Sequence, residues 1–259
     1  MKPSITSAEK GGRVPLWAAA FWLLVWEAAA WWVDAPILLV SPITAVGRLL
    51  QLLPEASFWQ AVFFSVGRIL LGFSGGLLLG TALAALAYRF GWVRQLLSPL
   101  TAAVKAVPVA SFVILALLWV SSQNLSVLVS LLIGFPVVYA NVLAGLDSAD
   151  RKLIEMAHVF RVPFFRRATA IYLYQALPFL RSGLAVAIGL CWKSGVAAEV
   201  IGIPSGSIGE KLYMAKVYLE TPDLFCWTLV VVLLSVGCER LLALAFELAE
   251  RGMAGCWKR

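Results

Sequence analysis

The feature that most constrains this chain is a series of long apolar segments with few charged interruptions. Each approaches or exceeds the roughly 20 residues that a helix needs to cross the hydrocarbon core of a bilayer. The segments lack the alternation of barrel strands, and a helix satisfies its own backbone polar groups in lipid. The sequence therefore predicts an all-α membrane protein, a single transmembrane domain over residues 1–259, with spans at about 14–33, 61–88, 100–120, 125–146, 178–201 and 224–246.

Composition supports this class and excludes an ordinary soluble domain. Hydrophobic residues make up 61% of the chain and charged residues 14%, against about 45–50% and about 25% in soluble domains. The net charge of +7 is better explained by cytoplasmic loops than by a nucleic-acid partner. The only histidine is His158, and the four cysteines form no CxxC pair, so no metal site is expected.

The distribution of Lys and Arg predicts the orientation in the membrane. With the N-terminus inside, fourteen of these residues fall in cytoplasmic segments and three fall outside, at Arg48, Lys211 and Lys216. Such an excess on one side follows the positive-inside rule. We therefore expect the N- and C-termini to be cytoplasmic.

Two of the connecting segments are too long to be simple turns. The outer segment 34–60 contains Ser41 followed by Pro42, a pattern that starts helices, so we expect a short amphipathic helix there. The inner segment 147–177 is the most charged part of the chain, yet aromatic and aliphatic residues alternate with its charges. That mixture favours a docking surface over a solvated linker.

The inner segment also carries a motif. It resembles the EAA loop of ABC importer permeases, whose pattern is EAA, three residues, Gly, nine residues and I-x-L-P. Four residues fall on this pattern in register: Glu155, Ala157, Ile171 and Leu173. Three positions depart from it: Met156, Arg161 and Tyr174 replace an alanine, the glycine and the proline. Since the bend-forming glycine is missing, Pro163 is expected to supply the break between two short helices.

The resemblance extends over most of the chain. Further segments are similar to nitrate/sulfonate/taurine-type permeases: 65–72, Pro108, Trp119, Asn141, Gly145 and 197–199. The chain is identified as a member of this family by these positions together. The resemblance implies six transmembrane helices in the type I ABC importer permease fold, in the bacterial plasma (inner) membrane.

Partners are also implied by the resemblance. They are a second copy of this chain in a homodimer, two cytoplasmic ABC ATPase subunits and an extracytoplasmic substrate-binding protein. The chain has no GxxxxGK[ST] phosphate loop, and the glycines and lysine of 206–211 have the wrong spacing for one. We expect no enzyme activity and no cofactor in this chain, with ATP and Mg²⁺ on the partner ATPase.

The inner loop contains the expected contacts with the ATPase. A short helix seated in a groove would carry ATPase closure into the membrane. The residues assigned to this coupling are Glu155, Ala157, Phe160, Arg161, Phe164, Phe165 and Arg166. The alternative is that the arginines only follow the positive-inside rule and the aromatic side chains pack on the bundle.

Two further sets of residues have candidate roles inside the membrane. Lys193 and Glu199 are assigned to the translocation pathway, where Lys193 would attract an anionic solute; an internal ion pair of Lys193 with Glu27 or Glu199 is the alternative. Small residues at four-residue spacing allow close helix contact, within the subunit or at a dimer seam, at Gly72, Gly76 and Gly80.

The sequence thus predicts the permease subunit of an ATP-driven importer for a small, anionic or polar solute of the sulfonate, nitrate or vitamin-precursor class. A stand-alone secondary transporter or channel is the alternative, although such a protein has no need for an ATPase-docking loop and no inverted repeat is apparent. An intramembrane enzyme is disfavoured, because no HExxH motif is present and His158 is the only histidine.

Overall fold

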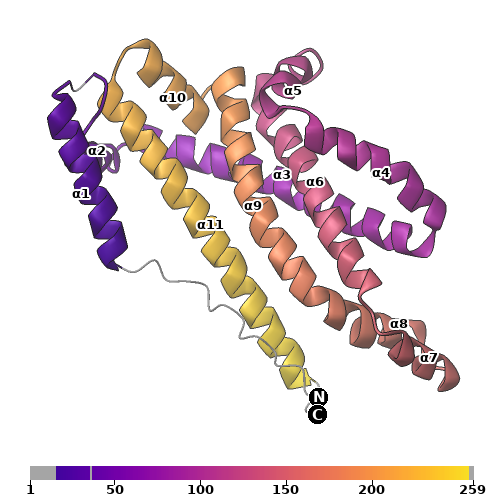
Figure 1. The fold of residues 1–259 in the computed structure, drawn as a ribbon. Helices are drawn as coiled ribbons and strands as arrows, with labels where there is room; N and C mark the ends of the chain where they lie inside the picture. Colours follow the sequence, from indigo (N-terminus) through magenta and orange to yellow (C-terminus); the bar gives the residue numbers. More distant parts are fainter. Residues whose placement is uncertain (1–15, 36, 257–259) are drawn as a thin grey trace.

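The structure is a computed structural model that describes residues 16–35 and 37–256. All regular elements of this described part are helices (Figure 1). In chain order they are α1 Leu16–Val33, α2 Pro42–Leu52, α3 Ala56–Arg89, α4 Gly91–Ala106, α5 Val109–Ala116, α6 Ser122–Asp147, α7 Arg151–Val159, α8 Phe164–Arg167, the π-helix η1 Ala168–Leu173, α9 Tyr174–Gly202, α10 Ile208–Val217 and α11 Thr221–Cys256.

Four of the described helices are long and apolar enough to cross a membrane. They are α3, α6, α9 and α11, and they cover the spans expected at 61–88, 125–146, 178–201 and 224–246. The helix α1 is apolar but shorter; its 18 residues rise roughly 27 Å, close to the roughly 30 Å of the hydrocarbon core. The all-helical membrane fold is confirmed, while the number of six spans stays a prediction.

The segment expected as one span at 100–120 is instead a bent helix pair. Its first helix, α4, begins earlier than expected, at Gly91, and ends at Ala106. The second helix, α5, follows after a bend of 101°. Val107 and Pro108 between them are extended, with ψ angles of 127° and 130°. Proline lacks a backbone N–H and disfavours the helical conformation in the residue before it, so Pro108 accounts for the break.

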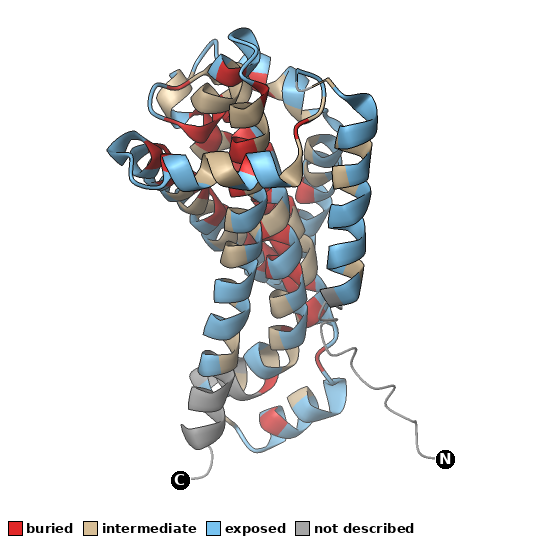
Figure 2. Ribbon diagram, turned by 90° about the vertical axis from the view of Figure 1, so that its left-hand side faces the viewer, coloured by how far each residue is buried: buried red, intermediate tan, exposed pale blue. Residues whose placement is uncertain are grey.

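The centre of the molecule is the packing of α6 between α3 and α9. In Figure 1, α9 runs between α11 and α6 while α3 crosses behind them. Buried residues follow the inside of this packing, and the outer sides of the helices are exposed (Figure 2). The largest apolar cluster joins residues of the three helices, including Ile69, Phe135, Val138, Ile188 and Trp192.

The contact between α3 and α6 depends on three glycines of α3. A Cβ added at Gly72 would lie 2.8 Å from Ser130 Cβ and still closer to the Val127 carbonyl oxygen. The equivalent atom at Gly76 would lie 3.0 Å from the Leu131 carbonyl oxygen, and at Gly80 2.8 Å from that of Phe135. These glycines therefore serve helix packing inside the subunit.

The helices α6 and α9 approach each other as closely. Ser130 Oγ donates to the Cys191 carbonyl oxygen at 3.2 Å, and Cys191 Sγ donates to the Ser130 carbonyl oxygen at 3.1 Å. A Cβ at Gly195 of α9 would lie 2.8 Å from Ser130 Oγ and 2.7 Å from a side-chain carbon of Ile69. Three helices thus meet around Ser130.

Short helices cover the end of the bundle that is expected to be outside. The expected helix after Ser41 is confirmed as α2, whose first-turn Thr44 N–H donates to Ser41 Oγ at 3.2 Å. Its Arg48 forms a bidentate ion pair with Asp223 at the start of α11, with Nη2 donating to Oδ2 at 3.1 Å. Two segments far apart in the chain are thereby joined.

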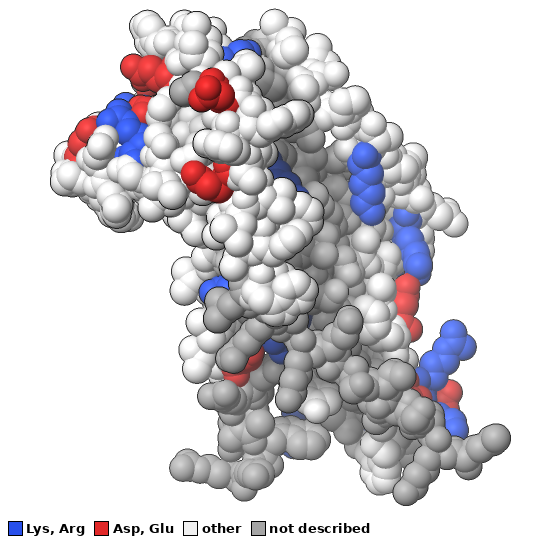
Figure 3. Space-filling model, turned by 60° about the vertical axis from the view of Figure 1, so that its left-hand side comes forward, with Lys and Arg blue, Asp and Glu red and all other residues white. Residues whose placement is uncertain are grey.

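The surface is that of a membrane protein. Only 6% of the apolar window of α11 is buried, and Trp31 and Trp32 at the end of α1 are 84% and 85% exposed. In Figure 3 several acidic side chains gather at the upper left of the visible face, and others lie toward its lower end. Tryptophans at span ends suit the interface between lipid and water.

The glycine packing of α3 leads to a first prediction. Gly72→Ala should lower the free energy of unfolding by about 1–3 kcal/mol, because the new methyl group must push α3 away from the backbone of α6. Gly67→Ala is the matched control, since a Cβ there meets nothing within 4 Å. Equilibrium unfolding of the purified protein in mixed micelles measures both. Equal stability of the two variants would contradict the packing role.

Candidate functional site

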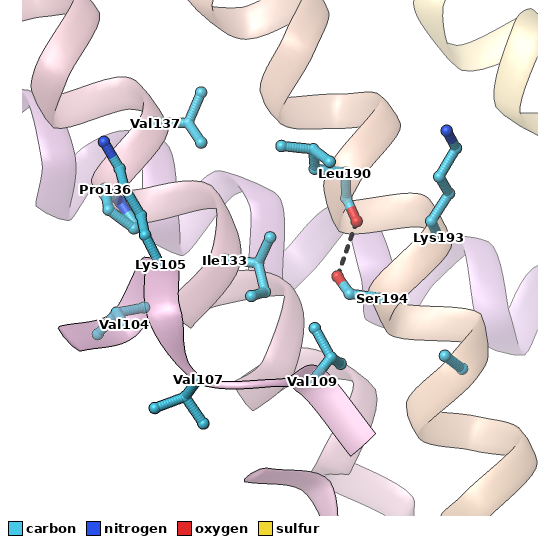
Figure 4. A pocket seen from close by; sticks show the side chains of 11 residues that line it. Val104, Lys105, Val107, Val109, Ile133, Pro136, Val137, Leu190, Lys193 and Ser194 are labelled. Carbon is cyan, nitrogen blue, oxygen red and sulfur yellow. Dashed lines mark hydrogen bonds between the residues drawn. The ribbon is translucent and has the colours of Figure 1, made fainter. Parts of the chain in front are cut away.

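A cleft of about 390 Å³ opens where α4 and α5 meet α6 and α9 (Figure 4). Its size lies in the range of small-molecule sites. Most of its lining is apolar and comes from three sides: Val104, Val107 and Val109 near the helix break, Ile133, Pro136 and Val137 of α6, and Leu190 and Ala197 of α9. The polar lining residues are Lys105, Lys193 and Ser194.

Lys193, a residue predicted for the translocation pathway, lines this cleft and is exposed. It lies nine residues before the end of α9 at Gly202, or roughly 14 Å along the helix axis. The ion pairs among the described residues join Arg48 to Asp223, Arg94 to Asp147 and Arg181 to Glu247. None of these pairs joins Lys193 to Glu27 or Glu199, the partners of the alternative prediction.

Lys105 is a cleft residue that the sequence reasoning missed. It occupies the last turn of α4, two residues before Val107 and the helix break, and it is exposed. In Figure 4 Lys105 and Lys193 extend from opposite sides of the cleft, with both ammonium groups toward the upper edge of the view. A lysine inside the apolar segment 100–120 was a usable signal for such a residue.

Glu199, in contrast, does not line the cleft, and its assignment to the pathway stays a prediction. The residue is fully buried, and its carboxylate faces the start of α10. Ser65 Oγ of α3 donates to Glu199 Oε2 at 2.6 Å, and the Gly209 N–H donates to the same oxygen at 3.4 Å. A carboxylate near the first N–H groups of a helix is favoured by hydrogen bonding and by the helix dipole.

Ser65 connects three elements at this point. While it donates to Glu199, its Oγ also accepts a hydrogen bond from the Ile208 N–H of α10 at 2.9 Å. The space between α9 and α10 admits no side chain at Gly209, where an added Cβ would overlap Glu199. From the sequence, Ser65 was noted only within the segment 65–72 that is similar to the permease family. Its contacts with Glu199 and Ile208 could not be predicted, because these residues are more than 130 positions away in the chain.

The inner loop forms two short helices with a sharp turn between them. The turn after α7 is a Schellman motif, in which the Val162 N–H donates to the Ala157 carbonyl oxygen at 2.9 Å and the Arg161 N–H to that of His158 at 3.1 Å. Arg161 has a φ of 47°, a left-handed conformation. The backbone thus keeps the bend that glycine makes in the family pattern, although an arginine stands there.

The predicted coupling residues occupy different environments in this loop. Ala157 is buried, Glu155 and Arg161 are exposed, and Phe160 is 75% exposed beside the 78% exposed Val159. Arg166 is also exposed. The side chains of Phe164 and Phe165, which begin α8, lie outside the described part of the structure.

The inner loop is tied to the helix that lines the cleft. The Asp150 N–H, just before α7, donates to Gln175 Oε1 at the start of α9 at 2.8 Å. Asp150 also caps α7 by accepting from the Lys152 N–H at 2.9 Å. This hydrogen bond links the start of α7 to the start of α9, the helix that contains Lys193.

The Ser65 connection can be tested by substitution. Ser65→Ala leaves the Ile208 N–H buried without this acceptor and should lower stability by about 1–3 kcal/mol. Hydrogen exchange measured by mass spectrometry should be faster across 208–217 than in the parent protein. Ser74→Ala on the exposed side of α3 is the control and should change neither quantity. Unchanged exchange in Ser65→Ala would show that α10 is held by other contacts.

The conformation of Arg161 gives a third prediction. An L-residue in the left-handed region is strained by about 1–2 kcal/mol, so Arg161→Gly should stabilise the inner loop by about 1 kcal/mol. Arg161→Ala removes the same side chain but retains the strain, and it should give no such gain. Thermal unfolding compares the two variants. A similar gain in both would mean that the side chain, and not the backbone, is responsible.

Comparison with known proteins identifies the family of the chain. The family described as binding-protein-dependent transport system inner membrane component matches residues 76–254. The putative aliphatic sulfonates transport permease of Bacillus subtilis is 27% identical over 83% of this chain and 77% of its own length. The riboflavin transport system permease of Chloroflexus aurantiacus is 28% identical over 78% of this chain and 76% of its own length.

A third relative, the taurine transport system permease of Escherichia coli, is 26% identical over 86% of this chain and 82% of its own length. The matched residues 76–254 are well over half of the chain and include the cleft helices α6 and α9 and the whole inner loop. The chain therefore belongs to the family of binding-protein-dependent transport system inner membrane components, as an ABC importer permease that crosses the plasma membrane several times.

Proposed function

We propose that this chain forms the translocation pathway of an ATP-driven importer as a homodimer. Two cytoplasmic ATPase subunits bind ATP and Mg²⁺, and an extracytoplasmic binding protein delivers the solute. The observation that carries this proposal is the inner loop, an exposed helical turn joined by a hydrogen bond to the helix that lines the cleft. The family membership supports ATPase and binding-protein partners in general.

The proposed orientation has α7 and α8 in the cytoplasm together with both termini, and α2 and α10 outside. Six segments then cross the bilayer, with α1 and the bent pair α4–α5 as two of them. The excess of Lys and Arg in the inner segments supports this direction. In Figure 1 α10 and α5 lie at one end of the bundle and α7 and α8 at the other, as this orientation requires.

Coupling to the ATPase is assigned to the exposed apolar end of α7. Met156, Val159 and Phe160 are 50%, 78% and 75% exposed on a segment that this orientation puts in water. Large apolar side chains exposed together on a polar side of a protein indicate a docking surface. Glu155 and Arg161 flank them as charged residues, which is the anatomy of an interface with an apolar centre and a polar rim.

The cleft beside α4 and α5 is the proposed pathway within one subunit. An ammonium group at bilayer depth costs about 2.5–3.5 kcal/mol, so Lys193 is expected to face water or a ligand and not lipid. The second copy of the chain would close the open side of the cleft. The solute belongs to a small anionic or polar class, for which sulfonates, nitrate and vitamin precursors are the candidates.

A stand-alone transporter or channel is the competing function. It would need no ATPase, and the exposed side chains of α7 would then lie free in solution or pack on another part of the same chain. Co-purification with the ATPase subunit separates the two functions, because only an ABC permease retains it.

Crosslinking tests the coupling surface directly. With p-benzoylphenylalanine in place of Phe160, irradiation of the assembled complex should give a covalent adduct with the ATPase subunit, since this side chain is 75% exposed on the proposed interface. The same photoprobe in place of Leu219, 70% exposed after the outer helix α10, is the control and should give none. Phe160→Ala should uncouple transport from ATP hydrolysis or loosen the complex. If Phe160 is a central anchor, the binding free energy between the permease and the ATPase should fall by about 2 kcal/mol. An active complex without the Phe160 adduct would overturn the assignment.

A further inference from the structure

We propose that the corner formed by α1 and α2 binds phosphatidylethanolamine of the outer leaflet. The apolar side of α2 contacts the acyl chains, and a pocket between the two helices binds the ammonium headgroup. The inference rests on the proposed function for one point, the orientation in which α1 crosses the bilayer and α2 lies at its outer side. It gives a role to a region that takes no part in the proposed pathway or in ATPase docking.

The helix α2 has one apolar side that is exposed. This side presents three large apolar residues at helical spacing, Ile43, Val46 and Leu50, which are 73%, 45% and 63% exposed. The opposite side packs on the bundle, where Ala45 and Leu52 are buried. The only charged residue of α2 is Arg48, and it is paired with Asp223 of α11. The exposed side of α2 is therefore both apolar and free of charge.

A hydrogen bond to α1 indicates the depth of α2 in the membrane. Trp26 Nε1 donates to the Val40 carbonyl oxygen, just before α2, at 3.0 Å. Trp26 lies seven residues before the end of α1 at Val33, or roughly 10 Å along the helix axis. The start of α2 thus lies near the level of Trp26, below the outer end of α1. An amphipathic helix at the bilayer surface buries its apolar side by about 5–10 Å, which matches this depth.

Lipid suits this side of α2 better than a soluble protein does. An interface with a soluble protein has a polar rim, whereas the exposed side of α2 has no charged residue. The helix also lies between two elements with lipid-like surroundings, α1 and α11 (Figure 1). Most of α1 is exposed, and only 6% of the apolar window of α11 is buried. The apolar side of α2 therefore continues a surface that faces lipid.

A pocket of about 250 Å³ lies between α1 and the start of α2. Its lining includes Glu27 of α1 and Asp34 just after it, and no Lys or Arg. Glu27 Oε2 is buried and has no hydrogen-bond partner among the described residues. The ion pairs of the described residues include neither carboxylate. Because an unpaired carboxylate at bilayer depth is costly, we expect a cation in this pocket.

The surroundings of the pocket favour a lipid amine over a metal ion. Trp31 lines the pocket and is 84% exposed, as expected at the interface between lipid and water. Within the described ranges, no group of three or more Asp, Glu, His or Cys is placed to hold a metal ion. A primary ammonium has three N–H donors and can form charge-assisted hydrogen bonds with both Glu27 and Asp34. Phosphatidylethanolamine presents such a group at this depth, next to its acyl chains.

Photocrosslinking tests the contact of α2 with lipid. In the permease–ATPase complex, p-benzoylphenylalanine replaces Leu50, and the nanodiscs contain phosphatidylcholine and phosphatidylethanolamine. After irradiation, mass spectrometry of the intact permease should show the added mass of one phospholipid. The photoprobe in place of Phe160, on the inner loop, is the control and should give no lipid adduct. If the Leu50 probe gives no lipid adduct, or reacts only with a second permease copy or an added binding protein, the lipid assignment is overturned.

Matched lipids test the headgroup. Thermal unfolding of the complex is compared in phosphatidylcholine nanodiscs with and without phosphatidylethanolamine of the same acyl chains. Phosphatidylethanolamine should raise the Tm, because choline has no N–H to donate. Glu27→Gln should weaken its binding about tenfold and thus remove most of the rise in Tm. Glu55→Gln, exposed and outside the pocket, is the control and should retain the rise.

Asp34→Asn is a second variant that keeps the local backbone. Position 34 has a φ of 42°, a conformation that asparagine tolerates as aspartate does, so only the charge is lost. This variant should also reduce the response to phosphatidylethanolamine. A full response in both Glu27→Gln and Asp34→Asn would overturn the headgroup site, as would an equal rise in Tm with free ethanolamine in phosphatidylcholine. Failure of the ATPase to co-purify would instead contradict the proposed function, so the two failures are distinguishable.

Discussion

The close approach of α3 to α6 is the contact on which the rest of the structure depends. Gly72, Gly76 and Gly80 bring one helix backbone against the other, and Gly195 lets α9 join them at Ser130. In lipid there is no hydrophobic force between helices, so association relies on such close packing and on interhelical hydrogen bonds. The cleft exists because this three-helix packing holds α6 and α9 at a set spacing, while the proline break turns α5 away from α4.

Polar contacts then fix the two ends of α9. At its outer end, Glu199 accepts a hydrogen bond from Ser65, which in turn accepts one from the first N–H of α10. At its inner end, Gln175 accepts a hydrogen bond from the Asp150 N–H just before α7. One helix therefore connects the proposed ATPase-docking surface, the cleft with Lys193 and the outer helix α10. In the proposed function, α9 is the element through which movement of the inner loop would reach the solute.

Much of the fold and part of the site could be predicted from the sequence. Apolar length indicated the long helices, Ser41 and Pro42 indicated α2, and the spacing from Glu155 to Leu173 indicated the family. The departures from the family pattern in the inner loop did not by themselves predict the local backbone. Because an arginine replaces the glycine at position 161, the sequence assigned the break to Pro163, but the Schellman hydrogen bonds hold Arg161 itself in the left-handed conformation that glycine usually adopts. Local propensity was overridden by the surrounding structure.

The sequence by itself determined the class of protein, because the length of apolar segments and the placement of Lys and Arg are properties of the chain alone. Only the tertiary structure decided which polar residues share a site. Lys105 and Lys193 are 88 positions apart and line one cleft, whereas Glu199, six positions from Lys193, lies in a buried contact outside it. Helix geometry turns each residue by about 100°, so proximity in sequence does not give a shared face, and only packing brings distant helices to one cleft.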